Sequence, residues 1–82
     1  VRDKEKREVD FLITKNKQPW FLVEVKTANA SSISKHLFYF QRELNVPHAF
    51  QVVIDMAYED VDCFQYHTPI VVPAKTLLSQ LV

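Results

Sequence analysis

Two strand-like runs near the N-terminus constrain the fold of this chain more than any other feature. Apolar side chains occupy every second position in residues 8–14 and again in residues 20–26. A β-strand imposes that period, because successive side chains point to opposite faces of the sheet. The five residues between the runs, 15–19, include Asn16 and Pro19, which favour turns. We therefore predict an antiparallel hairpin with a five-residue loop.

This hairpin gathers charged side chains on one of its faces. Closing the loop at residues 15–19 gives four expected cross-strand pairs, Thr14 with Trp20, Leu12 with Leu22, Asp10 with Glu24, and Glu8 with Lys26. Like charges directly opposite each other destabilise a sheet, so Asp10 against Glu24 requires a cation. Lys26, one step along the same face, is one such cation. A divalent metal held by carboxylate oxygens is another.

A carboxylate pair beside a lysine supplies the groups needed for metal-assisted hydrolysis of a phosphodiester. A metal polarises the phosphoryl oxygen and acidifies water, and an ammonium group offsets charge that grows in the transition state. Asp10, Glu24 and Lys26 are therefore the candidate catalytic residues. The alternative is a surface salt-bridge cluster of Glu8 and Glu24 with Lys26, which would add little stability.

The same residues carry a family resemblance. Asp10, thirteen intervening residues and then Glu24-Val25-Lys26 resemble the PD-(D/E)XK signature of restriction-endonuclease-like nucleases, with Val9 in place of the signature proline. More narrowly, the run Arg7 to Ile13 together with Val23 to Lys26 resembles the uncharacterised C-terminal domain of prokaryotic AAA-type ATPases. The resemblance covers residues 1–55 well and the remainder loosely.

The resemblance implies a Mg²⁺- or Mn²⁺-dependent nuclease domain that acts on DNA and is attached to an ATPase domain. In it, Asp10, Glu24 and the backbone carbonyl of Val25 would hold the metal, and Lys26 would position the attacking water. The superfamily usually has a further acidic residue on a helix before the first strand. Because this helix would precede Val1, we expect residues 1–82 to form a single, partial domain with the ATPase upstream. The alternative is a non-catalytic module of an ATPase that binds a partner or nucleic acid.

The rest of the chain predicts an α/β fold. Apolar residues at helical spacing predict a helix over 33–44, which is followed by a buried strand over 49–54. Strand, helix and strand form a βαβ crossover with parallel strands, so the expected sheet is mixed, with a restriction-endonuclease-like core. A short strand over 70–72 and a helix over 74–81 complete it. We expect the first helix to cover Leu12, Trp20 and Leu22.

Charge is distributed unevenly along the chain. Residues 1–42 hold nine Lys and Arg against five acids, a net charge of +4, whereas residues 43–82 hold one against five, a net charge of −4. The basic half is suited to phosphate, and Lys35 lies in the first turn of the predicted helix, whose free N–H groups attract anions. Lys35 is therefore the candidate nucleic-acid contact. The alternative reading of the basic stretch is a solvated hairpin surface.

The remaining polar residues predict no second site. Glu59, Asp60 and Asp62 fit no calcium-loop spacing, so we predict a solvated link over residues 55–69. The three histidines likewise lack the spacing of metal ligands and are expected to be structural or surface residues, namely His36, His48 and His67.

The amino-acid composition limits the turn types and the cellular location that we expect. Glycine is absent, so turns with positive φ must use residues such as Asn16 and Asn45. The single cysteine, Cys63, cannot form an internal disulfide, and no apolar run approaches 18 residues. We therefore expect a cytoplasmic protein without a membrane span. Exposed strand edges make a homodimer a further expectation.

Overall fold

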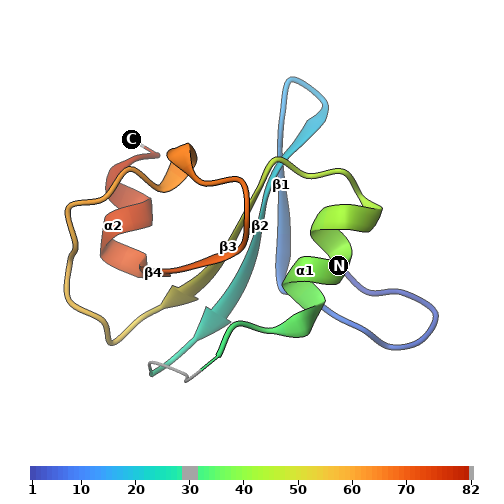
Figure 1. Cartoon of the computed structure of the whole chain (residues 1–82), viewed down its shortest axis with the longest axis horizontal. Helices are drawn as coiled ribbons and strands as arrows, with labels where there is room; N and C mark the ends of the chain where they lie inside the picture. The colour runs from blue at the N-terminus through green and yellow to red at the C-terminus, as the bar shows by residue number, and fades with distance from the viewer. Residues whose placement is uncertain (29–31, 82) are drawn as a thin grey trace.

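A four-stranded mixed sheet with the strand order β1-β2-β3-β4 organises the molecule. The computed structural model describes residues 1–28 and 32–81. The first two strands are antiparallel and the last three are parallel, and their bounds are β1 (Phe11–Lys15), β2 (Gln18–Lys26), β3 (His48–Val53) and β4 (Ile70–Pro73). Helix α1 (Lys35–Glu43) joins β2 to β3, and helix α2 (Ala74–Ser79) follows β4 (Figure 1). The predicted α/β class, the hairpin and the βαβ unit are confirmed.

Strand β2 contributes to two separate cores because its side chains alternate between the faces of the sheet. On one face, Leu22 packs with Leu37 and Phe40 of α1. On the other, Phe21 and Val23 belong to the cluster that contains Leu77 of α2. The two helices therefore cover opposite faces of the sheet (Figure 1).

The connection between β1 and β2 is shorter than predicted. The strands extend to Lys15 and Gln18, so the turn consists of Asn16 and Lys17 alone, at φ values of 52° and 66°. Positive φ at both central residues is the geometry of a type I′ turn, whose twist matches that of paired strands. The predicted five-residue loop is therefore wrong.

The register nevertheless agrees with the prediction farther from the turn. A shift between Ile13 and Thr14 places Thr14 opposite Pro19, but Leu12 still faces Leu22. Strand β2 has one extra residue at this point, Trp20, which has no partner in β1, as in a β-bulge. Trp20 then packs beside Phe21 in the α2-side core. The expectations that Trp20 pairs with Thr14 and is covered by α1 are both wrong.

The start of β1 also differs from the prediction. The ladder with β2 begins at Phe11, because the preceding residues pair with the N-terminus instead. Glu8 forms an isolated bridge with Arg2, and the N–H of Val9 donates to the carbonyl of Val1 (2.8 Å). The predicted pairing of Glu8 with Lys26 is therefore wrong.

Helix α1 is shorter than the predicted range of 33–44. It begins after Ser34, whose hydroxyl accepts the N–H of His36 (3.2 Å). After its last residue, Asn45 takes a φ of 53°, as expected for a chain without glycine. Leu44, the last apolar residue of the predicted helix, is 37% exposed because it follows the end of α1.

The C-terminal part agrees with the prediction in outline. The link over residues 55–69 contains one short 3₁₀ helix, Cys63–Gln65. The last strand extends to Pro73, and α2 ends at Ser79 rather than at residue 81. The polar residues 27–32 predict a loop before α1, and residues 29–31 of it lie outside the described part. Within residues 1–28 and 32–81, no helix has the length and apolar character needed to cross a membrane.

The type I′ turn gives a test of this hairpin. Lys17→Gly should raise the free energy of unfolding by about 0.5–1 kcal/mol, because a Cβ at positive φ is strained and glycine carries none. Urea denaturation measures the change. Lys17→Ala, which removes the charge and keeps the Cβ, is the matched control and should not give this gain. Equal stability of the two variants would contradict the turn geometry.

Candidate functional site

The Asp10 carboxylate marks the point at which the β1–β2 ladder stops. Phe11 is the first β1 residue paired with β2, opposite Val23. The next β2 amide that points toward β1 belongs to Val25. No residue of β1 extends far enough to pair with it. The Asp10 carboxylate accepts that N–H instead, with 2.8 Å between Oδ2 and the Val25 nitrogen. Asp10 is thereby fixed against β2 beside Glu24.

Glu24 and Lys26 share the face of β2 that α1 covers farther along the strand. The Glu24 side chain is 13% exposed, and the Lys26 side chain is 42% exposed. Their charged atoms, Lys26 Nζ and Glu24 Oε2, are 3.9 Å apart. The structure therefore brings together all three residues that the sequence singled out, Asp10, Glu24 and Lys26.

The environment of Glu24 disfavours its charged form. Burial raises the pKa of Glu24, and the neighbouring Asp10 raises it further through charge repulsion and a hydrogen bond. Lys26 and the Ser34 hydroxyl oppose this shift but do not outweigh it. A cation bound beside the two carboxylates would relieve this repulsion.

A buried amide holds the N-terminus of α1 next to this pair. Gln51 in β3 is directly in register with Glu24 and is fully buried. Its Oε1 accepts the N–H of Ser34 (2.9 Å), and its Nε2 donates to the carbonyl of Ser32 (3.1 Å). Both halves of the amide are used, so Gln51 ties the segment before α1 to the sheet. Ser34 is in this way held beside Glu24.

Sequence reasoning missed Gln51 and Ser34. The available signal was a single polar residue inside an otherwise apolar strand, since Gln51 lies between Phe50 and Val52. A polar side chain in a buried strand requires hydrogen-bond partners, which points to a neighbouring loop.

The oxygen atoms of Asp10, Glu24 and Val25 are of the type that binds magnesium. Besides Oδ2, which accepts the Val25 amide, Asp10 has a second carboxylate oxygen on the side of Glu24. The carbonyl of Val25 faces the same side as its N–H, toward Asp10, because both groups of a strand residue point in one direction. Two carboxylates and one carbonyl suit Mg²⁺, which keeps several waters when it binds protein. In the part of the chain that the structure describes, no three His, Cys, Asp or Glu side chains cluster as a larger metal centre.

The other candidate residues lie at the start of α1 or make contacts that hold the fold together. Lys35 is the first residue of α1 and is exposed. His36 Nδ1 lies 3.2 Å from the carbonyl of Glu8. His48 bonds the carbonyl of Tyr66 through Nδ1 (2.7 Å) and stacks on His67, with 5.1 Å between ring centroids. The His36 contact joins α1 to the segment before β1, and the His48 contacts join β3 to the link before β4. Cys63 is buried, and burial raises the pKa of its thiol.

Comparison with known proteins gives one match. The family model described as "Domain of unknown function (DUF4143)" matches residues 1–77. No curated protein and no solved structure matches the chain. The matched range includes the whole sheet, α1 and the three residues of the candidate site.

The raised pKa of Glu24 predicts a pH dependence. The folded protein holds this proton more tightly than the unfolded chain does, so the contribution to stability is full below the ordinary value of 4.5 and is lost as pH rises through the folded-state pKa. Glu24→Gln removes that loss. We therefore expect the melting temperature of Glu24→Gln minus that of the wild type to become larger as the pH is raised from about 4 to about 7.

Glu43→Gln is the matched control, because Glu43 is an exposed glutamate at the end of α1. It reports the effect of losing one negative charge elsewhere. If the two variants show the same pH dependence, the environment assigned to Glu24 is wrong.

Proposed function

The chain belongs to the DUF4143 family, and from that premise we propose that it is a PD-(D/E)XK-type, Mg²⁺- or Mn²⁺-dependent nuclease domain. It acts on phosphodiester bonds of DNA and is attached to an AAA-type ATPase. One observation carries the proposal: two carboxylates, Asp10 and Glu24, are held side by side although they repel each other, with Lys26 next to them. Unfavourable electrostatics of this kind concentrate at functional sites.

Each residue of the site has a distinct role in this proposal. Asp10, Glu24 and the Val25 carbonyl hold the cation, and the hydrogen bond from the Val25 amide keeps Asp10 oriented toward it. When bound, the cation supplies polarisation of the phosphoryl oxygen and acidification of water. Lys26 is exposed enough to turn from Glu24 toward substrate, where its ammonium orients water and offsets transition-state charge.

Nucleic acid would approach from the basic half of the chain. Residues 1–42 carry the net charge of +4 and contain the whole site. Lys35 stands exposed at the N-terminus of α1, next to the N-cap Ser34 that adjoins Glu24. Its ammonium, at the positive end of the helix dipole, is suited to a phosphate group. Lys35 is therefore the proposed phosphate contact.

One observation favours a second function, a non-catalytic module of an ATPase that binds a partner or nucleic acid. Every charged group of the site already has a partner within the chain. Asp10 caps the Val25 amide, and Lys26 lies 3.9 Å from Glu24. A site of this kind can persist as structure after its chemistry is lost, because fold does not determine function.

Metal binding distinguishes the two functions. Mg²⁺ or Mn²⁺ at about ten times its Kd should stabilise the wild type by about 1.4 kcal/mol, a rise in melting temperature of several degrees, because only the folded state holds the site. Asp10→Ala should lose this response. Asp55→Asn, an exposed acid outside the site, is the control and should keep it. Equal responses of wild type and Asp10→Ala would exclude the metal site.

Catalysis depends on Lys26 in this proposal. Lys26→Ala should lower the rate of DNA nicking by the purified full-length protein about 10²–10³-fold, the loss seen when one charge-stabilising group is removed. Supercoiled plasmid gives the readout, and a melting curve verifies folding. Lys75→Ala, an exposed lysine of α2, should retain full activity. Activity that survives in Lys26→Ala would assign the cleavage to another site or to a contaminant.

A further inference from the structure

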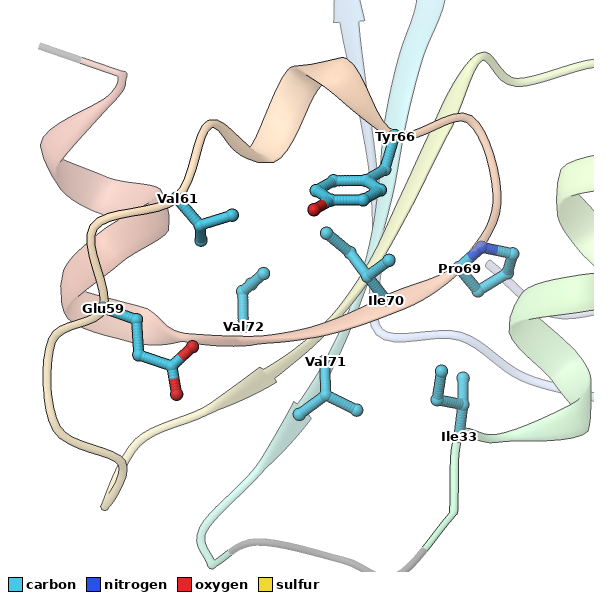
Figure 2. Close-up of a pocket in the computed structure, with 8 residues that line it drawn as sticks. All are labelled: Ile33, Glu59, Val61, Tyr66, Pro69, Ile70, Val71 and Val72. Carbon is cyan, nitrogen blue, oxygen red and sulfur yellow. The ribbon is translucent and has the colours of Figure 1, made fainter.

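A groove of about 390 Å³ runs along the outer edge of β4. Its walls come from both faces of the sheet. Val71 and Ile33 lie on the α1 side, and Val72, Val61 and Tyr66 lie on the α2 side (Figure 2). The groove therefore encloses an open sheet edge. It is separated from Glu24 by strand β3.

Hydrogen-bond alternation shows which β4 groups face the groove. The N–H of Ile54 donates to the carbonyl of Lys26 (3.0 Å), so even-numbered residues of β3 direct their amides toward β2. Odd-numbered residues, including Gln51, then direct theirs toward β4. Gln51 is in register with Val71. In a parallel ladder, a residue bonds the two neighbours of its partner, so Gln51 bonds Ile70 and Val72. The N–H and carbonyl of Val71 therefore point outward.

The two flanking outward positions are prolines. By the same alternation, residues 69 and 73 face outward with Val71, and they are Pro69 and Pro73. Proline has no N–H to donate, and it protects sheet edges from extended pairing. Val71 is therefore the single outward donor along Pro69–Pro73. This edge can accept one residue of a partner strand through a pair of hydrogen bonds, but not a long strand.

One acidic residue, Glu59, lines the groove, and it belongs to an acidic segment of the link before β4. Residues 55–62 contain four acids and no Lys or Arg, namely Asp55, Glu59, Asp60 and Asp62. None of the four takes part in an ion pair within the described residues. The backbone N–H and carbonyl of Glu59 are both held by the Thr76 hydroxyl (2.8 Å each), and its side chain lines the groove beside β4 (Figure 2). A cationic side chain in the groove would meet an unneutralised carboxylate.

We propose that the β4 edge binds a short, extended, basic-apolar peptide segment of a protein partner. The central peptide residue pairs with Val71, and its apolar side chain lies on the face of Val71 and Ile33. Side chains alternate along a strand, so both neighbours point to the face of Glu59 and Tyr66. One neighbour is apolar and fills the groove, and the other is Lys or Arg and pairs with Glu59. This surface is independent of the proposed nuclease activity.

Two fluorescein-labelled peptides with opposite chain directions, Ser-Lys-Val-Leu-Ser and Ser-Leu-Val-Lys-Ser, both with blocked termini, test the proposal against the full-length protein. Fluorescence anisotropy gives the Kd. One of the two should bind, and replacing its Lys by Glu should weaken binding about threefold to fivefold or more. Methylating the nitrogen of its Val should weaken binding about tenfold, because a donor to the Val71 carbonyl is lost.

Protein variants locate the site. In Glu59→Gln, the Kd of the Glu-containing peptide should exceed that of the Lys-containing peptide by less than about twofold. Asp55→Asn makes the same charge change outside the groove, so it should preserve the wild-type ratio of the two Kd values. Val71→Pro removes the outward donor without touching the β3–β4 ladder, and it should abolish binding. Circular dichroism verifies its fold. If that variant unfolds, the N-methylated peptide tests the same hydrogen-bonded pairing without altering the protein.

Three results would overturn the proposal. The first is the absence of binding by either peptide up to millimolar protein. The second is equal binding of the parent and N-methylated peptides, or unchanged discrimination in Glu59→Gln. The third is concentration-dependent dimerisation that the peptide suppresses and Val71→Pro abolishes, which would assign the edge to a second copy of this chain.

Discussion

The hydrogen bond from the Val25 amide to the Asp10 carboxylate decides the character of this molecule's candidate site. Strand pairing between β1 and β2 could have continued past Phe11, and a backbone carbonyl would then have met that amide. The chain instead turns back toward Val1, and a side chain takes the place of the ladder. A charged acceptor is the stronger partner, so the substitution costs little at Val25. Its consequence is an aspartate fixed beside Glu24, whose side chain is largely buried.

That arrangement leaves an electrostatic imbalance that the surrounding residues do not remove. The Lys26–Glu24 contact is long, at 3.9 Å, and the lysine is 42% exposed, so its contribution lies at the low end of the 0–1 kcal/mol range that is typical of surface ion pairs. Burial and the neighbouring Asp10 still hold the pKa of Glu24 above its ordinary range. A structure that only had to be stable would gain from a neutral residue here. The imbalance is what a cation would relieve.

The sequence predicted the central Leu12–Leu22 pair of the hairpin but neither its turn nor its outer pairs. Leu12 faces Leu22 as predicted, although Phe11 and Ile13, the alternating apolar residues of β1, are exposed. The turn depends on Lys17 at positive φ, which the identity of a lysine does not signal, and Trp20 changed faces because the register shift adds one residue. Gln51 escaped prediction for another reason: its partners, Ser32 and Ser34, are 19 and 17 residues away in the sequence. Contacts of that separation are set by the fold.

Strand β3 separates the two surfaces proposed for this protein and also connects them. Gln51 is in register with Glu24 on one side and with Val71 on the other. Two strand spacings put β2 and β4 about 10 Å apart, which exceeds the Debye length of about 8 Å at physiological ionic strength. Solvent-exposed charges at one surface, such as Lys26 and Lys35, are therefore largely screened from the other. Any remaining coupling would require β3 to shift, and all six of its residues are buried between neighbours, which opposes such movement. Nucleic acid on the basic side and a basic peptide at the β4 edge should thus bind independently of each other.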